Sequence, residues 1–302
     1  MTFLSAISSV KQFQVSSKSG RVLDVAVAGP ESGIPLVFHH GTPGSHLLFE
    51  PFIEATISRG LRYVSYTRPG YGNSTRQAGR RISDCVNDVA VILDQLGARR
   101  IYVIGWSGGG PHAIACAALL SKEVIAASTI ASLAPSNAQN LDWLAGMGKE
   151  NIEEFGAALN GPDKLQSFLE HVGPDFAHVT KDQIIAALGD LIPDVDKESL
   201  SGRLGSFLAD NTQEALRNGF WGWLDDDIAF VYDWGFDLER IKVPVSIWQG
   251  RKDRMVPFEH GRWLTEHIPE ARPHLLPDHG HLSLAVSSFE RILDDLISDE
   301  KH

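Results

Sequence analysis

The chain has 302 residues, of which 43% are hydrophobic and 22% charged, and its formal net charge is −11 at pH 7. This acidic balance argues against binding to nucleic acid, because a phosphate backbone is bound by a basic surface. No apolar run approaches the roughly 20 residues of a membrane span. We therefore expect neither nucleic acid nor a membrane as a partner.

The cysteine content and the N-terminus favour a cytoplasmic location. The two cysteines, Cys85 and Cys116, lack metal-type or redox spacing, and so low a number suits a reducing compartment. We expect Cys116 to be a core residue. The first thirteen residues contain no basic segment followed by a long apolar run, so no secretory signal is expected.

The first 135 residues alternate strand-like and helix-like segments. Short runs around 13–15 and 22–27, separated by Ser17-Lys18-Ser19-Gly20, predict a β-hairpin. Further strands are predicted from apolar runs at 34–38, 62–66, 101–104 and 124–131. Helices are predicted at about 46–59, at 82–96 and in the Ala/Leu-rich stretch up to 120.

The pattern changes between 136 and about 236, where strand signals are absent. This segment predicts several helices, broken at Gly161-Pro162, Gly173-Pro174, Pro193 and Gly202. Alternation resumes with a strand at 243–250, a helix at 256–267, a strand at 272–276 and a closing helix at 282–297. We therefore predict an α/β core of residues 1–135 and 237–302, with a helical insertion of residues 136–236 over the rim of the sheet.

The predicted strands are nearly continuous in apolar residues, which is typical of a parallel sheet covered by helices on both faces. In such sheets the ligand site lies beyond the carboxyl ends of the strands. Glycine-rich loops at 41–44, 70–72 and 105–110 each follow a predicted strand. We expect these loops to share one rim of the sheet.

The segment Gly105-Trp106-Ser107-Gly108-Gly109 lies between a predicted strand and a predicted helix. This arrangement is typical of a nucleophile elbow, in which a serine is held on a strained turn with its hydroxyl exposed. Side chains at Gly105 and Gly109 would collide where strand and helix approach each other. Ser107 is the candidate nucleophile, and we expect Trp106 to be buried behind the elbow.

A serine nucleophile needs a base, and the base needs a carboxylate that fixes its tautomer. On this architecture both should follow late strands, in the order Ser, Asp, His. Asp253 follows the strand at 243–250, although an ordinary helix N-cap would explain it too. His281 follows the last strand, beside Gly280, and is the candidate base; His279 is the alternative.

A tetrahedral intermediate also needs hydrogen-bond donors for its oxyanion. The N–H of Gly108, directly after the nucleophile, is one candidate. The second should come from the loop at 40–44, where Pro43 has no N–H, so Gly41 or Thr42 must supply it; we favour Thr42. His40 is expected to hold this loop by hydrogen bonds.

These motifs occur in a characteristic order: His40-Gly41-Thr42-Pro43-Gly44, Arg68-Pro69-Gly70-Tyr71-Gly72-Asn73-Ser74, Gly105-Trp106-Ser107-Gly108-Gly109, Gly250-x-x-Asp253 and Gly280-His281. Together they resemble the ordered motifs of the α/β-hydrolase superfamily, over nearly the whole chain except the insertion. The resemblance implies an eight-stranded, mostly parallel sheet with a helical cap after strand six. It also implies the triad Ser107, Asp253 and His281, and no metal or organic cofactor. Serine at the elbow is unlike the haloalkane dehalogenase and epoxide hydrolase branches.

The main functional hypothesis is a serine hydrolase that cleaves small to medium carboxylic esters through an acyl-enzyme. The insertion is rich in aromatic residues, which would form an apolar substrate pocket or simply pack the insertion onto the sheet. No oligomeric state is predicted.

An aminopeptidase is the alternative. The loop HGTPG is similar to the HGGPG of prolyl aminopeptidases, whose caps use carboxylates to hold a substrate's amino terminus. Asp225-Asp226-Asp227 would be the carboxylates, but we interpret this run as a solvated loop. Thr42 in place of glycine, and GWSGG in place of GGSWG, depart from that branch. A non-catalytic ligand receptor on the same fold is a further alternative.

Overall fold

The computed structural model describes residues 10–298. The expectation of no secretory signal concerns mainly residues 1–9 and lies outside this range. Among the described residues, no helix is long and apolar enough to cross a membrane.

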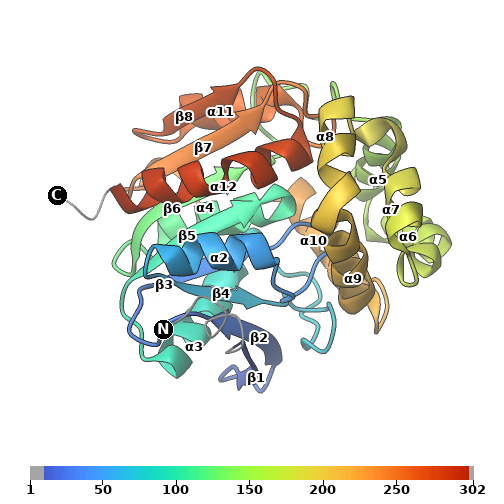
Figure 1. Ribbon diagram of the computed structural model, residues 1–302. Helices are drawn as coiled ribbons and strands as arrows, with labels where there is room; N and C mark the ends of the chain where they lie inside the picture. The colour runs from blue at the N-terminus through green and yellow to red at the C-terminus, as the bar shows by residue number, and fades with distance from the viewer. Residues whose placement is uncertain (1–9, 299–302) are drawn as a thin grey trace.

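Eight strands form one sheet, in the spatial order β1-β2-β4-β3-β5-β6-β7-β8 (Figure 1). Their bounds are Lys11–Ser16 (β1), Val22–Ala28 (β2), Pro35–His39 (β3), Arg62–Tyr66 (β4), Ile101–Trp106 (β5), Val124–Ile130 (β6), Val245–Gly250 (β7) and Arg272–Leu276 (β8). β1 pairs with β2, and β2 with β4, in antiparallel fashion; all other pairs are parallel. The predicted fold class, an eight-stranded and mostly parallel sheet, is confirmed.

Helices cover both faces of the sheet, because both faces are apolar. In β3, Leu36 and Phe38 pack in the hydrophobic cluster on one face, and Val37 packs in the cluster on the other. The first cluster includes helices α2 (Glu50–Ser58) and α12 (His281–Ile297). The second includes α3 (Cys85–Leu96), α4 (Gly110–Leu119) and α11 (Phe258–His267). The strands are buried on both sides, as their continuous apolar runs predict.

The helix predicted at 46–59 begins only at Glu50. His46 lies outside it because its N–H donates to Thr67 Oγ1 at 2.9 Å, a bond that holds the loop after β3 against β4. Pro51 then occupies the first turn of α2, where its missing N–H has no helical partner to lose.

The segment between β6 and β7 is helical, and we call residues 136–236 the helical insertion. Its helices are α5 (Lys149–Leu159), α6 (Pro162–Phe176), α7 (Lys181–Ala187), α8 (Asp194–Ser199), α9 (Gly205–Leu216) and α10 (Trp221–Val231). They lie together at one end of the sheet (Figure 1). The insertion follows the sixth strand, as predicted. That the core of residues 1–135 and 237–302 and this insertion are separate domains stays a prediction.

Three of the four predicted breaks in the insertion coincide with real ones. α6 begins at Pro162, α8 follows Pro193, and Gly202 has non-helical dihedral angles between α8 and α9. The break at Gly173-Pro174 is wrong, because α6 continues through it to Phe176. A proline this close to the end of a helix removes only one helical hydrogen bond.

Candidate active site

Ser107 stands on a strained turn between β5 and α4. Its backbone has a positive φ of 55°, a conformation uncommon for a residue with a side chain. A Cβ atom at Gly105 would collide with the carbonyl of Gly109, and one at Gly109 would collide with the carbonyl of His39. The steric reason given for the glycines of the elbow is therefore confirmed.

Asp253 and His281, from the loops after β7 and β8, meet in the fold. His281 Nδ1 lies 2.8 Å from Asp253 Oδ2, and the two side chains are buried. The other carboxylate oxygen of Asp253 accepts the N–H groups of Met255 and Val256, both at 2.9 Å. Burial disfavours the imidazolium of His281, but the Asp253 carboxylate outweighs burial and raises the pKa of His281 above its ordinary value.

Ser107 and His281 line the same cavity, and His279 is not among the residues that line it. Among the described residues, no hydrogen bond joins the hydroxyl of Ser107 to His281; such bonds commonly tighten only when substrate binds. Trp106 is buried, as predicted, but it does not lie simply behind the elbow. It lines this cavity, and its ring lies 6.1 Å from the ring of His281.

The loop after β3 brings Thr42 beside Gly108. A Cβ atom at Gly108 would strike the side chain of Thr42, so the backbone of Gly108 and Thr42 are neighbours. His40 holds this loop, as predicted: its Nδ1 lies 2.7 Å from the Gly41 carbonyl, and its Nε2 accepts the N–H of Arg68 at 3.3 Å.

Asp226 links the insertion to this loop. The prediction that Asp225-Asp226-Asp227 form a solvated loop is wrong, because all three lie in α10 and are buried. Asp226 accepts hydrogen bonds from Arg68, Arg80, Tyr71 and Thr42 at 2.6 to 2.8 Å. Burial by itself would raise the pKa of Asp226, but the two guanidinium groups hold it well below its ordinary value.

The two residues beside Asp226, Asp225 and Asp227, have different hydrogen-bond partners from Asp226 and from each other. Asp225 forms a bidentate pair with Arg76, at 2.8 and 2.9 Å. Asp227 is fully buried, and neither of its carboxyl oxygens accepts a hydrogen bond from an N–H or hydroxyl group among the described residues. Burial and the charge of Glu154 raise the pKa of Asp227 well above its ordinary value, because two adjacent carboxyl groups, one of them fully buried, resist double ionisation. Trp223 Nε1 donates to Glu154 at 2.6 Å.

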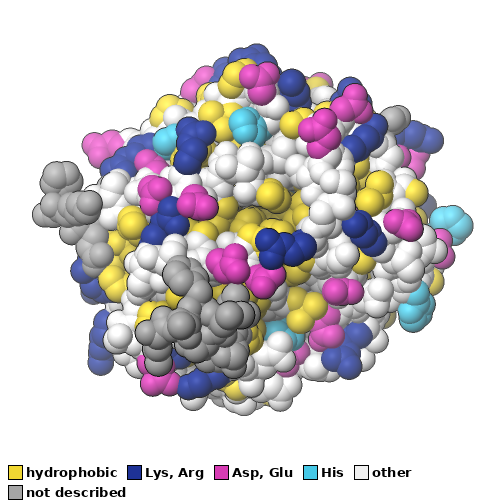
Figure 2. All heavy atoms as spheres, viewed as in Figure 1, with side chains coloured by type: hydrophobic (Ala, Val, Ile, Leu, Met, Phe, Trp, Pro, Cys, Tyr) yellow, Lys and Arg dark blue, Asp and Glu magenta, His cyan; other side chains and the backbone are white. Residues whose placement is uncertain are grey.

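Asp227 and Glu154 line a second cavity, which also reaches Ser107 and Thr42. The two cavities therefore meet at the elbow. The first is walled largely by apolar side chains, whereas the second contains these carboxyl groups. Several aromatic residues of the insertion line one cavity or the other: Phe155, Phe168, Phe176, Phe207, Trp223 and Phe230. Figure 2 shows hydrophobic side chains gathered in a hollow near the centre of one face, where the core meets the insertion.

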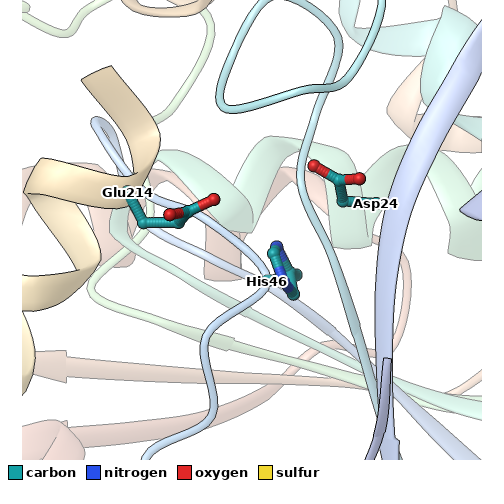
Figure 3. A group of neighbouring side chains, drawn as sticks. All are labelled: Asp24, His46 and Glu214. Carbon is teal, nitrogen blue, oxygen red and sulfur yellow. The ribbon is translucent and has the colours of Figure 1, made fainter. Parts of the chain in front are cut away.

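Away from these cavities, one group within residues 10–298 has the donor set of a metal site. Ligand atoms of Asp24, His46 and Glu214 all lie within 4.8 Å of one another, and the side chains point toward a common centre (Figure 3). They already have protein partners: Thr67 for His46, Gln14 and Asn73 for Asp24, and Arg217 for Glu214. We assign this group no part in the chemistry at Ser107.

The sequence analysis missed two acidic residues near the site, Asp196 and Glu154, and it missed the structural role of Asp226. Asp196, in α8, accepts the backbone N–H of His281 at 2.8 Å. No local pattern could have indicated this contact, because the two residues are 85 positions apart.

The fold and this arrangement define an α/β hydrolase. A family model for the alpha/beta hydrolase fold matches residues 34–287, and the chain belongs to this family. It is similar to the uncharacterized hydrolase YcgS of Bacillus subtilis, 27% identical over 270 residues that cover 87% of this chain and 89% of the relative. It is also similar to the bifunctional esterase/perhydrolase DCH of Acinetobacter calcoaceticus, 25% identical over 291 residues that cover 94% and 98%. Among solved structures, an esterase from Exiguobacterium antarcticum has the same fold, with a TM-score of 0.69 and 23% identity, covering 97% of this chain and 100% of that one.

Proposed function

We propose that the protein is a serine hydrolase that cleaves small to medium carboxylic esters. The observation that carries the proposal is the 2.8 Å contact between His281 Nδ1 and Asp253 Oδ2, together with the cavity that His281 lines with Ser107 on its strained turn. Esterase activity in the name of the Acinetobacter relative supports it.

In the proposed reaction, Ser107 Oγ attacks the carbonyl carbon of the ester while His281 Nε2 takes its proton. Asp253 fixes the tautomer of His281 and stabilises the imidazolium that forms. The N–H groups of Gly108 and Thr42 stabilise the tetrahedral oxyanion. His281 then gives the proton to the leaving alcohol, and water hydrolyses the acyl-enzyme with His281 again acting as the base.

The helical insertion acts as a cap in this proposal. Its apolar residues wall the first cavity, where Phe176 and Phe207 lie with Ser107, and such a surface suits the hydrocarbon part of an ester. A cytoplasmic location is also part of the proposal, supported by the two free, buried cysteines.

The test uses a fluorophosphonate probe and p-nitrophenyl esters of several chain lengths. We expect the probe to label the wild type at Ser107, and at least one ester to be turned over. Ser107→Ala should abolish both signals while circular dichroism shows an intact fold. Absence of labelling and of turnover in the wild type would contradict the proposal and favour a non-catalytic ligand receptor.

An aminopeptidase is the second candidate, and the carboxyl pair Asp227 and Glu154 favours it. Both groups line the cavity that reaches Ser107, Asp227 fully and Glu154 partly buried, and neither forms an ion pair with a basic side chain among the described residues. A substrate ammonium group would supply the missing positive charge.

Proline p-nitroanilide and its N-acetyl derivative separate the two candidates. The aminopeptidase proposal expects turnover of the free amine alone, and expects Asp227→Asn to abolish that turnover without preventing labelling of Ser107. Equal rates on the two anilides, or no turnover of either, would contradict it.

A further inference from the structure

Asp196 caps the helix that begins with His281. Its Oδ2 accepts the backbone N–H of His281 at 2.8 Å. Its Oδ1 accepts the N–H of Ser283 at 2.8 Å and the hydroxyl of Ser283 at 2.6 Å. The residue in the usual capping position, Gly280, has no side chain with which to cap α12. A residue of the insertion therefore performs this role for a helix of the core.

The charge of Asp196 is buried without a basic partner. The residue has 0% exposure, and no lysine or arginine among residues 10–298 is hydrogen-bonded to its carboxylate. Its charge is stabilised by N–H groups in the first turn of α12, where a helix favours an anion. When His281 is protonated, its imidazolium is the full positive charge on α12 that lies nearest to Asp196.

The charged and titratable groups around His281 come from separate elements. Asp253 follows β7 and bonds to the ring, Asp196 comes from α8, and His279 precedes α12. The ion pairs of Arg59 with Glu290 and Asp294 lie at the far end of α12. The imidazolium would thus be stabilised by two carboxylates, one from the core and one from the insertion.

We propose that Asp196 is a positioning residue for His281: it holds the first turn of α12 in place and stabilises the imidazolium formed when His281 takes the Ser107 proton. This inference rests on the proposed role of His281 as the base. It means that His281 is fully positioned only when α8 is docked on the core. The insertion therefore contributes to proton transfer as well as to substrate enclosure.

The first test compares Asp196→Asn with Asp194→Asn, a control on the same helix whose side chain is 97% exposed. His281 must be neutral to accept a proton, and the Asp196 charge favours its protonated form. Asp196→Asn should therefore shift the acid limb of the kcat/KM profile to lower pH and lower kcat roughly tenfold, with little change in KM. Asp194→Asn should match the wild type.

The second test measures the pKa of His281 directly by NMR titration. It should fall in Asp196→Asn but not in Ser283→Ala, which removes the bonds of the Ser283 hydroxyl to Asp196 and to the N–H of Gly280 but keeps the charge of Asp196. If Asp196→Asn does not fold, Asp196→Ser keeps a capping oxygen without the charge and replaces it.

If Asp196→Asn left both the acid limb of the kcat/KM profile and the pKa of His281 unchanged, the inference would be overturned, even if the variant were less stable. Failure of the proposed function would look different. The wild type would then neither react with fluorophosphonate nor hydrolyse esters, while the NMR titration would still decide whether Asp196 acts on His281.

Discussion

The sheet core and the helical insertion both bring buried carboxylates to the region of Ser107, but these carboxylates are held in different ways. Asp253, in the core, bonds to N–H groups two and three residues later in the chain. Asp226, in the insertion, bonds to core residues 146 to 184 positions earlier. The core carboxylate is therefore positioned largely by its own loop, whereas the insertion carboxylate is positioned only by docking of the insertion.

This difference has consequences for stability and for chemistry. A substitution at the core carboxylate or its histidine should affect proton transfer more than folding. A substitution at Asp226 leaves Arg68 and Arg80 buried without their partner, so it should affect folding first. The following variants test that distinction.

The largest effect is expected for His281→Ala. Loss of the base should reduce kcat/KM for a p-nitrophenyl ester by on the order of 10⁴-fold, with little change in the urea midpoint. His279→Ala is the matched control and should retain nearly full activity, because His279 is not among the residues that line the cavity. The reverse pattern would identify His279 as the base.

Asp226→Ala should cause the largest loss of stability. Removing one partner from a buried ion-pair network costs about 3–5 kcal/mol in the free energy of unfolding, which urea denaturation measures. Asp225→Ala should cost about 1 kcal/mol, because its partner Arg76 is 35% exposed and can be solvated by water. Equal losses in the two variants would contradict the proposed importance of the network.

Gly108→Ala tests the proposed oxyanion hole. The added methyl group would strike the side chains of Thr42 and Phe230, which displaces the two proposed donors from each other. We expect kcat to fall on the order of 10²-fold with a smaller change in KM. Gly156→Ala, at a helical position with open space around it, should leave kcat unchanged. A normal kcat in Gly108→Ala would place the oxyanion donors elsewhere.

The smallest effect is expected for Asp227→Asn; it is a change in the free energy of unfolding, and its size depends on pH. Because the folded-state pKa of Asp227 is raised, its protonated form stabilises the fold at low pH, and this stability is lost as the pH rises through that pKa. Asparagine stays neutral and can donate to Glu154. The variant should thus be more stable than the wild type by about 1 kcal/mol at pH 8, and by less at pH 5. A wild type that is the more stable of the two at pH 8 would show that Asp227 has a stabilising partner.

Much of the fold was predictable because it depends on local patterns. Continuous apolar runs indicated buried parallel strands, and β3 has side chains in both hydrophobic clusters. The candidate nucleophile was predictable for the same reason: Gly105 and Gly109 are required where strand and helix approach each other around Ser107. Asp253 and His281 could be proposed because each follows a predicted strand, and the carboxyl ends of parallel strands meet at one edge.

By itself, then, the sequence determined the order of strands and helices, the rim on which the candidate site lies, and which residues are candidates for the chemistry. Only the tertiary structure decided what the acidic residues of the insertion do. In the sequence, Asp225-Asp226-Asp227 has the composition of a solvated loop, and Asp196 has no distinguishing neighbour. The roles of Asp225, Asp226 and Asp196 depend on partners that lie 85 or more positions away. A carboxylate is stable in the interior only when donors reach it; for these residues the donors come from distant parts of the chain, and no local pattern records where they will be.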